Sequence, residues 1–297
     1  MWLLFALIGT IFYAIVHILD SHCVGNIFEK PWFGVITGAM SSMIIYPIAI
    51  IISPFISWEL PTLTILLLSL LAGFFLQLSY YFYFVALSHS EAGIIAAYWN
   101  MVPALLPITT YLFIGNSLSL FNYLGIVLLI LFSTIMCLVD SNTKTRWRSF
   151  FLMLLACCAQ LVSYLLQSYI FNHINFITGF YAITTGLILT GLLPLLIPQV
   201  RKTFVKSMYK IRPSVHVILM IEIANLLALF SIQRSVSLNN PSLVSAIITT
   251  LPGFIFILSI ILIFVNSKFG DSRTKHQIAI KFATVLGMVI GVILVSR

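Results

Sequence analysis

Residues 62–87 read TLTILLLSLLAGFFLQLSYYFYFVAL, a run without a single charged side chain. An apolar run of about 18 or more residues is long enough to cross the hydrocarbon core of a bilayer as a helix. In lipid the backbone groups must find partners within the segment, and a helix provides them. The stretch therefore predicts a transmembrane helix. It decides the fold class because similar runs follow one another on both sides of it.

The whole chain has the composition of a membrane protein. Of its 297 residues, 61% are hydrophobic and 7% are charged, whereas an ordinary soluble domain carries about 25% charged residues. The formal net charge of +8 comes from Lys and Arg in a few connecting segments. That distribution is typical of loops retained in the cytoplasm and does not favour nucleic-acid binding. The expected partners are a lipid bilayer and a small molecule.

Ten apolar spans are predicted along the chain. They cover residues 2–19, 33–56, 62–87, 92–114, 123–139, 150–171, 176–198, 215–236, 243–265 and 278–295. The first lacks the basic start and the cleavage site of a signal peptide, so we expect it to be retained as a helix. The sequence thus predicts an all-α integral membrane protein with ten transmembrane helices.

An internal repeat divides the chain into two halves. Pro103 and Pro252 stand 149 positions apart, each inside an apolar span. Residues 1–145 and 146–297 would then carry five helices each, and an odd number inverts the second half relative to the first. Inverted repeats are typical of secondary transporters, whose substrate site lies at the repeat interface near the bilayer midplane.

Basic residues set the predicted orientation. They gather after the fifth, seventh and ninth spans, at Lys144, Arg146, Arg148, Arg201, Lys202, Lys206, Lys210, Arg212, Lys268, Arg273 and Lys275. The positive-inside rule puts these segments in the cytoplasm and both termini outside.

Three local motifs carry a family resemblance. Residues 86–93, Ala-Leu-Ser-His-Ser-Glu-Ala-Gly, run into Pro103, residues 115–119, Gly-Asn-Ser-Leu-Ser, precede Gly125, and the last span holds Gly287 and Gly291. Together with the span count, these motifs resemble the drug/metabolite transporter superfamily, in particular its ten-helix EamA-type branch.

The resemblance brings its own expectations. It implies movement of a small metabolite, often by export, across a membrane that we take to be a bacterial inner membrane. The chain departs from the family pattern at Asn116, where Glu is usual, and at Ser133, where Gly is usual. Such relatives place both termini in the cytoplasm, the reverse of the orientation that the basic residues predict.

Polar side chains inside lipid are costly, so they mark the candidate pathway. Tyr13, His17 and Asp20 follow the spacing i, i+4, i+7, which puts them on one face of the first span. The further candidates for substrate binding lie on the third, fourth, sixth and eighth spans and are Gln77, Tyr80, Tyr81, Trp99, Asn100, Gln160, Tyr164, Gln167, Glu222 and Asn225. We expect these five spans to line a central cavity. The second, fifth, seventh and tenth spans are nearly bare of charge and should face lipid or pack outside.

Glu222 is the acidic residue that lies well inside a span. We interpret it as a carboxylate that couples protons or contacts the substrate, with His17 and Asp20 as further candidates for proton coupling. For each of them the alternative is a structural hydrogen bond between helices, and Glu222 could instead pair with Arg234. The many Tyr and Trp side chains favour an aromatic or amphipathic solute, such as an amino acid, and ring faces also attract cations.

The function that these patterns favour is secondary transport of a small organic metabolite by alternating access. A lipid-carrier flippase and a non-transporting membrane scaffold are the alternatives. An enzyme is not expected, because H-E-x-x-H, G-x-S-x-G and a Gly-rich phosphate loop are all missing from the sequence. No metal or cofactor is expected either, because the four cysteines match no ligand spacing. The patterns do not specify substrate, direction, coupling ion or oligomeric state.

Overall fold

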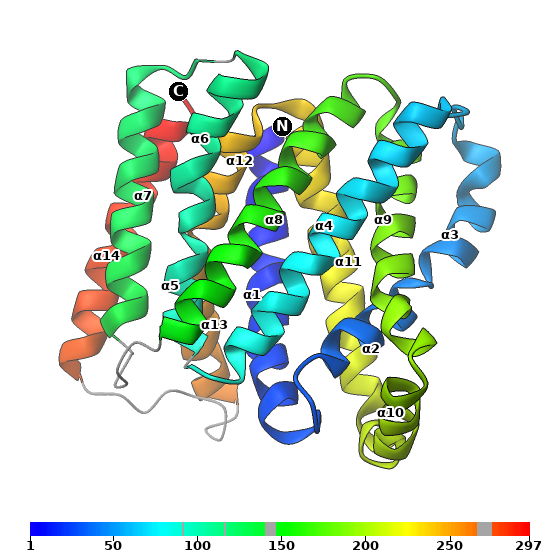
Figure 1. Ribbon diagram of the computed structural model, residues 1–297. Coiled ribbons are helices and arrows are strands. Elements are labelled where there is room, and N and C mark those ends of the chain that lie inside the picture. The colour runs from blue at the N-terminus through cyan, green and yellow to red at the C-terminus, as the bar shows by residue number, and fades with distance from the viewer. Residues whose placement is uncertain (91, 116, 140–146, 266–274) are drawn as a thin grey trace.

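The computed structural model describes residues 1–90, 92–115, 117–139, 147–265 and 275–297. Within these ranges the regular structure is helical throughout and holds no strand (Figure 1). The prediction of an all-α chain is therefore confirmed. The motif residues Glu91 and Asn116, and the basic residues Lys144, Arg146, Lys268 and Arg273, lie outside the described residues.

The helices run in the order α1 (Trp2–Asn26), α2 (Phe33–Ser42), α3 (Ile45–Ile52), α4 (Leu63–Leu87), α5 (Ala92–Trp99), α6 (Met101–Ile114), α7 (Leu120–Val139), α8 (Trp147–Phe171), α9 (Phe176–Leu192), α10 (Pro198–Ile211), α11 (Val215–Leu238), α12 (Pro241–Ile248), α13 (Leu251–Val265) and α14 (Lys275–Val295). Three short 3-10 turns lie between them, η1 (Ser53–Phe55), η2 (Leu193–Leu196) and η3 (Arg212–Ser214).

Nine stretches of the described residues are long and apolar enough to cross a membrane. They are Trp2–Val24, Phe33–Phe55, Leu63–Leu87, Leu120–Val139, Trp147–Phe171, Phe176–Leu196, Arg212–Leu238, Pro241–Ile261 and Ile278–Val295. The chain is an integral membrane protein of many spans. The predicted count of ten is not confirmed, because residues 92–114 form two helices that meet at Asn100 and are not among the nine.

Three predicted spans are broken, and each break precedes a proline in the first turn of the following helix. α2 gives way to α3 before Pro47, α5 to α6 before Pro103, and α12 to α13 before Pro252. Proline has no amide hydrogen and its ring clashes with the carbonyl four residues earlier, so it weakens the helix at that point. The prolines therefore favour these breaks without requiring them, since Pro107 lies inside α6 and does not interrupt it.

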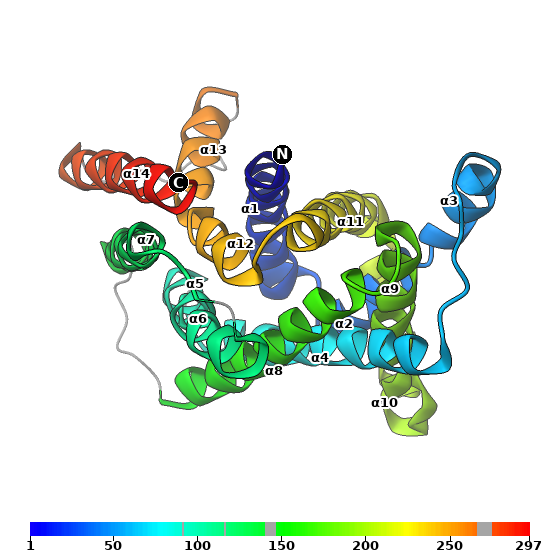
Figure 2. The same ribbon diagram turned by 90° about the horizontal axis from the view of Figure 1, so that it is seen from above.

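The long helices pack in pairs. α4 lies against α8 on one side and α9 on the other, α1 lies along α11, and α7 lies along α14. Viewed from above, α1 and α11 stand opposite α8 and α4 (Figure 2). Apolar side chains outside these contacts, such as Phe113 and Leu112, are largely exposed, as expected of a surface that faces lipid.

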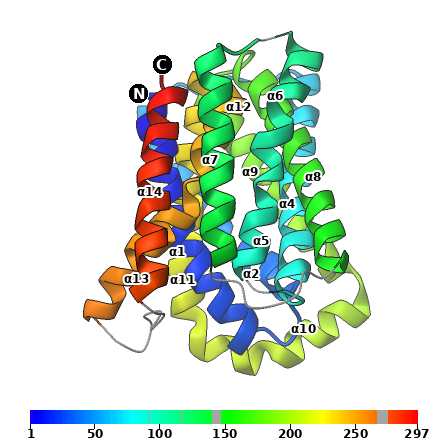
Figure 3. The same cartoon turned by 90° about the vertical axis from the view of Figure 1, so that its left-hand side faces the viewer.

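The basic segment after the seventh span is not the loop that the sequence analysis expected. Residues Pro198–Ile211 form α10, which lies across the end of the bundle at a large angle to the spans (Figure 3). Phe204 and Ile211 are buried against α1, α2 and α11, so the protein itself supports this helix.

Glycine allows the closest contact between α4 and α9. A Cβ atom on Gly73 would collide with the backbone of Ile183 and Leu187, which cannot move away without shifting α9. We expect Gly73→Ala to destabilise the protein by about 1–3 kcal/mol, the usual cost of overpacking. Thermal unfolding of the purified protein in detergent measures this as a lower melting temperature.

The matched control is Gly253→Ala. Its new Cβ would meet the flexible end of Met288, with the sulfur 3.1 Å away, and we expect a much smaller change in melting temperature. Equal changes in the two variants would contradict the close-packing argument.

Candidate functional site

A cavity of about 120 Å³ lies inside the helical bundle. The polar and aromatic side chains that line it are Tyr13, His17, Asp20, Ser42, Gln77, Tyr80, Tyr83, Phe84, Trp99, Gln160, Tyr164, Glu222 and Asn225. They come from α1, α2, α4, α5, α8 and α11. Neither Lys nor Arg occurs among the described residues that line the cavity.

Two carboxyl groups define the electrostatics of the cavity. Asp20 is 8% exposed and Glu222 is 7% exposed. The Glu222 carboxylate accepts a long hydrogen bond from Asn225 Nδ2 at 3.4 Å. The other side of the Glu222 carboxylate lies against α2. A Cβ atom built on Gly38 would be only 2.9 Å from Glu222 Oε1. The missing side chain at Gly38 therefore makes room for the carboxylate.

Glu222 does not pair with Arg234, which was one of the two structural alternatives for this residue. Twelve residues along a helix correspond to about 18 Å, too far for an ion pair. The Arg234 guanidinium instead lies over the Phe176 ring, 5.0 Å from its centroid. A cation over an aromatic face is a favourable arrangement.

Hydrogen bonds fix the other polar side chains in place. The Tyr83 hydroxyl and His17 Nδ1 are 2.8 Å apart, and the tautomer of His17 decides which of them donates. The hydroxyls of Tyr13 and Tyr80 are 3.3 Å apart. These bonds link α1 to α4 and hold the four side chains in fixed positions on the cavity wall.

Two amide side chains tie the cavity to neighbouring helices. Ser79 Oγ donates to Gln160 Oε1 at 2.8 Å, which joins α4 to α8. Gln77 Nε2 donates to the carbonyl of Val35 at 3.1 Å, which joins α4 to α2. Both amides thus have structural bonds as well as a place on the cavity wall.

Most of the sequence-predicted residues meet in this cavity. Those that line it are Tyr13, His17, Asp20, Gln77, Tyr80, Trp99, Gln160, Tyr164, Glu222 and Asn225. Tyr81 does not; it is 40% exposed and is not among the residues that line the cavity. Gln167 is not among the lining residues either; it is buried, and its Nε2 donates to Ser163 Oγ at 2.9 Å.

Asn100 lies at the break between α5 and α6 and lines a second, smaller cavity of about 20 Å³. Its Nδ2 donates to Ser133 Oγ at 3.0 Å and to Thr134 Oγ1 at 3.1 Å. The side chain therefore joins the break to α7. Thr249, at the break between α12 and α13, lines the same small cavity.

Two features differ from the expectation that the second and tenth spans lack site residues and buried charge. α2 lines the cavity through Gly34, Gly38 and Ser42, whose spacing i, i+4, i+8 puts them on one face of the helix. This stripe of small residues was the available signal. On α14, Lys281 is 5% exposed, with its Nζ 5.4 Å from the centroid of the Phe256 ring.

Tyr83 is a cavity residue that the sequence analysis did not select. It bonds to His17 and packs edge-on against Trp99, with the ring centroids 5.6 Å apart. Its position three residues after Tyr80 places both on one helix face. That spacing separates it from Tyr81, which lies outside the cavity.

The fold and the cavity define the chain as a helical membrane protein with a buried acidic and aromatic site. No protein-family model matches the chain, and no curated protein matches it. Solved structures do match. One, titled "Crystal structure of protein", has a TM-score of 0.64 and 11% sequence identity, and the match covers 97% of this chain and 98% of that one. At this identity the likeness shows the fold alone.

A double-mutant cycle tests the contact between Ser79 and Gln160. The two side chains are buried and bonded to each other, so Ser79→Ala and Gln160→Leu should show a coupling energy of about 0.6–1.5 kcal/mol. The measurement is chemical or thermal unfolding of the four proteins in detergent.

The control cycle joins Ser79→Ala with Ser235→Ala. Ser235 bonds to the carbonyl of Trp2, away from Ser79, so the two effects should add. Additivity of Ser79→Ala and Gln160→Leu would show that their bond adds nothing to stability.

Proposed function

We propose that this chain is a secondary transporter of small organic solutes, built from two inverted five-helix repeats as in the drug/metabolite transporter superfamily. The observation that carries the proposal is the pair of buried carboxyl groups, Asp20 and Glu222, in a cavity between membrane-spanning helices. Ionisable side chains at such depth are costly and mark substrate or ion pathways. The membrane would be the inner membrane of a bacterium.

The bounds of the helices support the repeat. α5 (Ala92–Trp99) and α12 (Pro241–Ile248) coincide when one is moved by 149 positions. The same shift brings α1 onto α8 and α4 onto α11, so the packed pairs α1–α11 and α8–α4 become equivalent. The breaks after α5 and α12 also coincide.

The lining of the cavity supports a cationic solute. The described lining holds two carboxylates but neither Lys nor Arg, and His17 can balance at most one of the two negative charges. Buried charge is stable only when it is paired. A protonated amine or a quaternary ammonium group supplies the counter-charge. The rings of Trp99 and the cavity tyrosines supply faces that attract cations and pack against apolar groups.

Protons and a cationic solute would then compete for the same carboxylates. When the solute leaves, Asp20 and Glu222 take up protons, because the described lining holds two carboxylates, no Lys or Arg, and His17 as its basic side chain. Exchange of the cationic solute for protons across the membrane would be proton-coupled transport by alternating access. His17, bonded to Tyr83, gives a further place where a proton is held.

Glu222→Gln tests the proposal directly. The substitution keeps the size of the side chain and removes its charge, so saturable uptake of an aromatic amine such as tyramine into proteoliposomes should fall at least tenfold. The thermal stabilisation that the amine gives the detergent-purified wild type should fall with it, since a ligand raises the melting temperature by mass action.

Glu59→Gln is the matched control. Glu59 is exposed, and its carboxylate accepts a hydrogen bond from the backbone of Asn175, outside the cavity. Gln retains an acceptor oxygen for that bond, so uptake should be unchanged. If amines, amino acids and quaternary ammonium compounds all fail to stabilise the wild type, while a lipid headgroup succeeds, the flippase replaces the solute transporter.

A further inference from the structure

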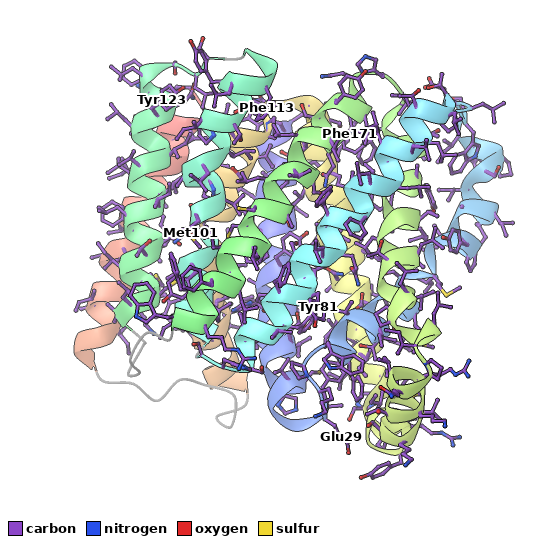
Figure 4. The ribbon with its side chains drawn as sticks, in the orientation of Figure 1. Glu29, Tyr81, Met101, Phe113, Tyr123 and Phe171 are labelled. Atoms are coloured by element: carbon purple, nitrogen blue, oxygen red, sulfur yellow. The ribbon has the colours of Figure 1, made fainter. Side chains whose placement is uncertain are left out.

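α10 has two different faces. Phe204, Ser207 and Ile211 are buried against the rest of the protein. The Phe204 ring meets Phe33, the first residue of α2, edge-on with the centroids 5.3 Å apart. Ser207 Oγ donates to the carboxylate of Glu29, which Figure 4 shows beside α10.

The opposite face combines positive charge with exposed apolar groups. Arg201, Lys202 and Lys206 are exposed, and Val205 and Tyr209 are 63% and 67% exposed. Residues 198–214 contain no Asp or Glu. A helix with this division suits the boundary between headgroups and acyl chains, because its apolar groups enter the lipid while its cations remain among the phosphates.

The place of α10 in the fold agrees with that boundary. The helix lies between the end of α9 and the start of α11, and it crosses the end of the bundle instead of continuing a span (Figure 3). Spans end where the hydrocarbon core ends. The exposed face of α10 is therefore at the depth of the lipid headgroups.

We propose that the exposed face of α10 is a binding surface for anionic phospholipids. Arg201, Lys202 and Lys206 contact the phosphates, and Val205 and Tyr209 enter the acyl boundary. Charge complementarity selects the occupant, because basic groups next to a membrane attract anionic headgroups and are indifferent to zwitterionic ones.

Lipid bound at this surface also supports the cavity. α10 packs on Phe33 at the start of α2, and α2 carries Gly34 and Gly38 into the cavity wall. A lipid that holds α10 in place thereby holds α2 against Glu222. This last consequence rests on the proposed transport function, whereas lipid binding itself does not.

The experiment uses the full chain purified in detergent and measures its melting temperature with added phosphatidylglycerol, phosphatidylcholine or inorganic phosphate at equal concentration. Phosphatidylglycerol should raise the melting temperature by several degrees more than phosphatidylcholine. The difference should shrink at high salt, because salt screens exposed charges. In the double variant Lys202→Gln/Lys206→Gln, the difference in melting temperature between the two lipids should fall to half or less.

The control is Arg148→Gln/Arg297→Gln, which removes the same charge from exposed residues outside α10. It should keep the full response. The proposal is overturned if the two lipids act alike, if both double variants respond in the same way, or if inorganic phosphate reproduces the effect of phosphatidylglycerol. Because no solute is involved, the result is independent of the amine uptake measured with Glu222→Gln.

Discussion

The need to pair every backbone amide and carbonyl inside lipid is the constraint on which this structure depends. It explains why the described chain is helical and how the proline breaks are accommodated. Pro47 has no amide hydrogen to donate to the carbonyl of Met43. The amide of Tyr46 donates to that carbonyl instead. At the other breaks, Asn100 and Thr250 form bonds of the i to i−3 type with Ala97 and Ile247. Each interruption is thus closed by a tighter turn.

The same constraint made much of the fold and of the site predictable from sequence. Long uncharged runs are candidates for spans, and polar side chains within them are favoured to face the protein interior. The stripes of Tyr13, His17 and Asp20 on α1 and of Glu222 and Asn225 on α11 therefore indicated the cavity. Periodicity is informative there because a polar group among Leu and Ile has one acceptable direction.

Other features were harder to predict from the sequence. α2 lines the cavity largely through glycine. Because glycine has no polar side chain, the polar pattern that indicates the other cavity helices is weak in α2. The i, i+3 spacing places Tyr80 and Tyr83 on one face of α4 and Tyr81 on another, but only the packing of α4 decides which face lines the cavity. α10 is polar enough to resemble a loop, and its helical form depends on burial of Phe204 and Ile211 against neighbouring helices. These are tertiary effects, which local pattern does not contain.

The helix breaks have a mechanical consequence. Pro103 and Pro252 cannot donate to the carbonyls of Trp99 and Ile248, so the helical ladder is already open at these two points. Bending there breaks at least one bond fewer than bending an intact helix, although the bonds from Ala104 to Asn100 and from Phe254 to Thr250 still span the two prolines. Trp99 and Ile248 both border the main cavity. Two of the points at which the helical ladder is weakened therefore lie where α5 and α12 end, and both ends form part of the cavity wall.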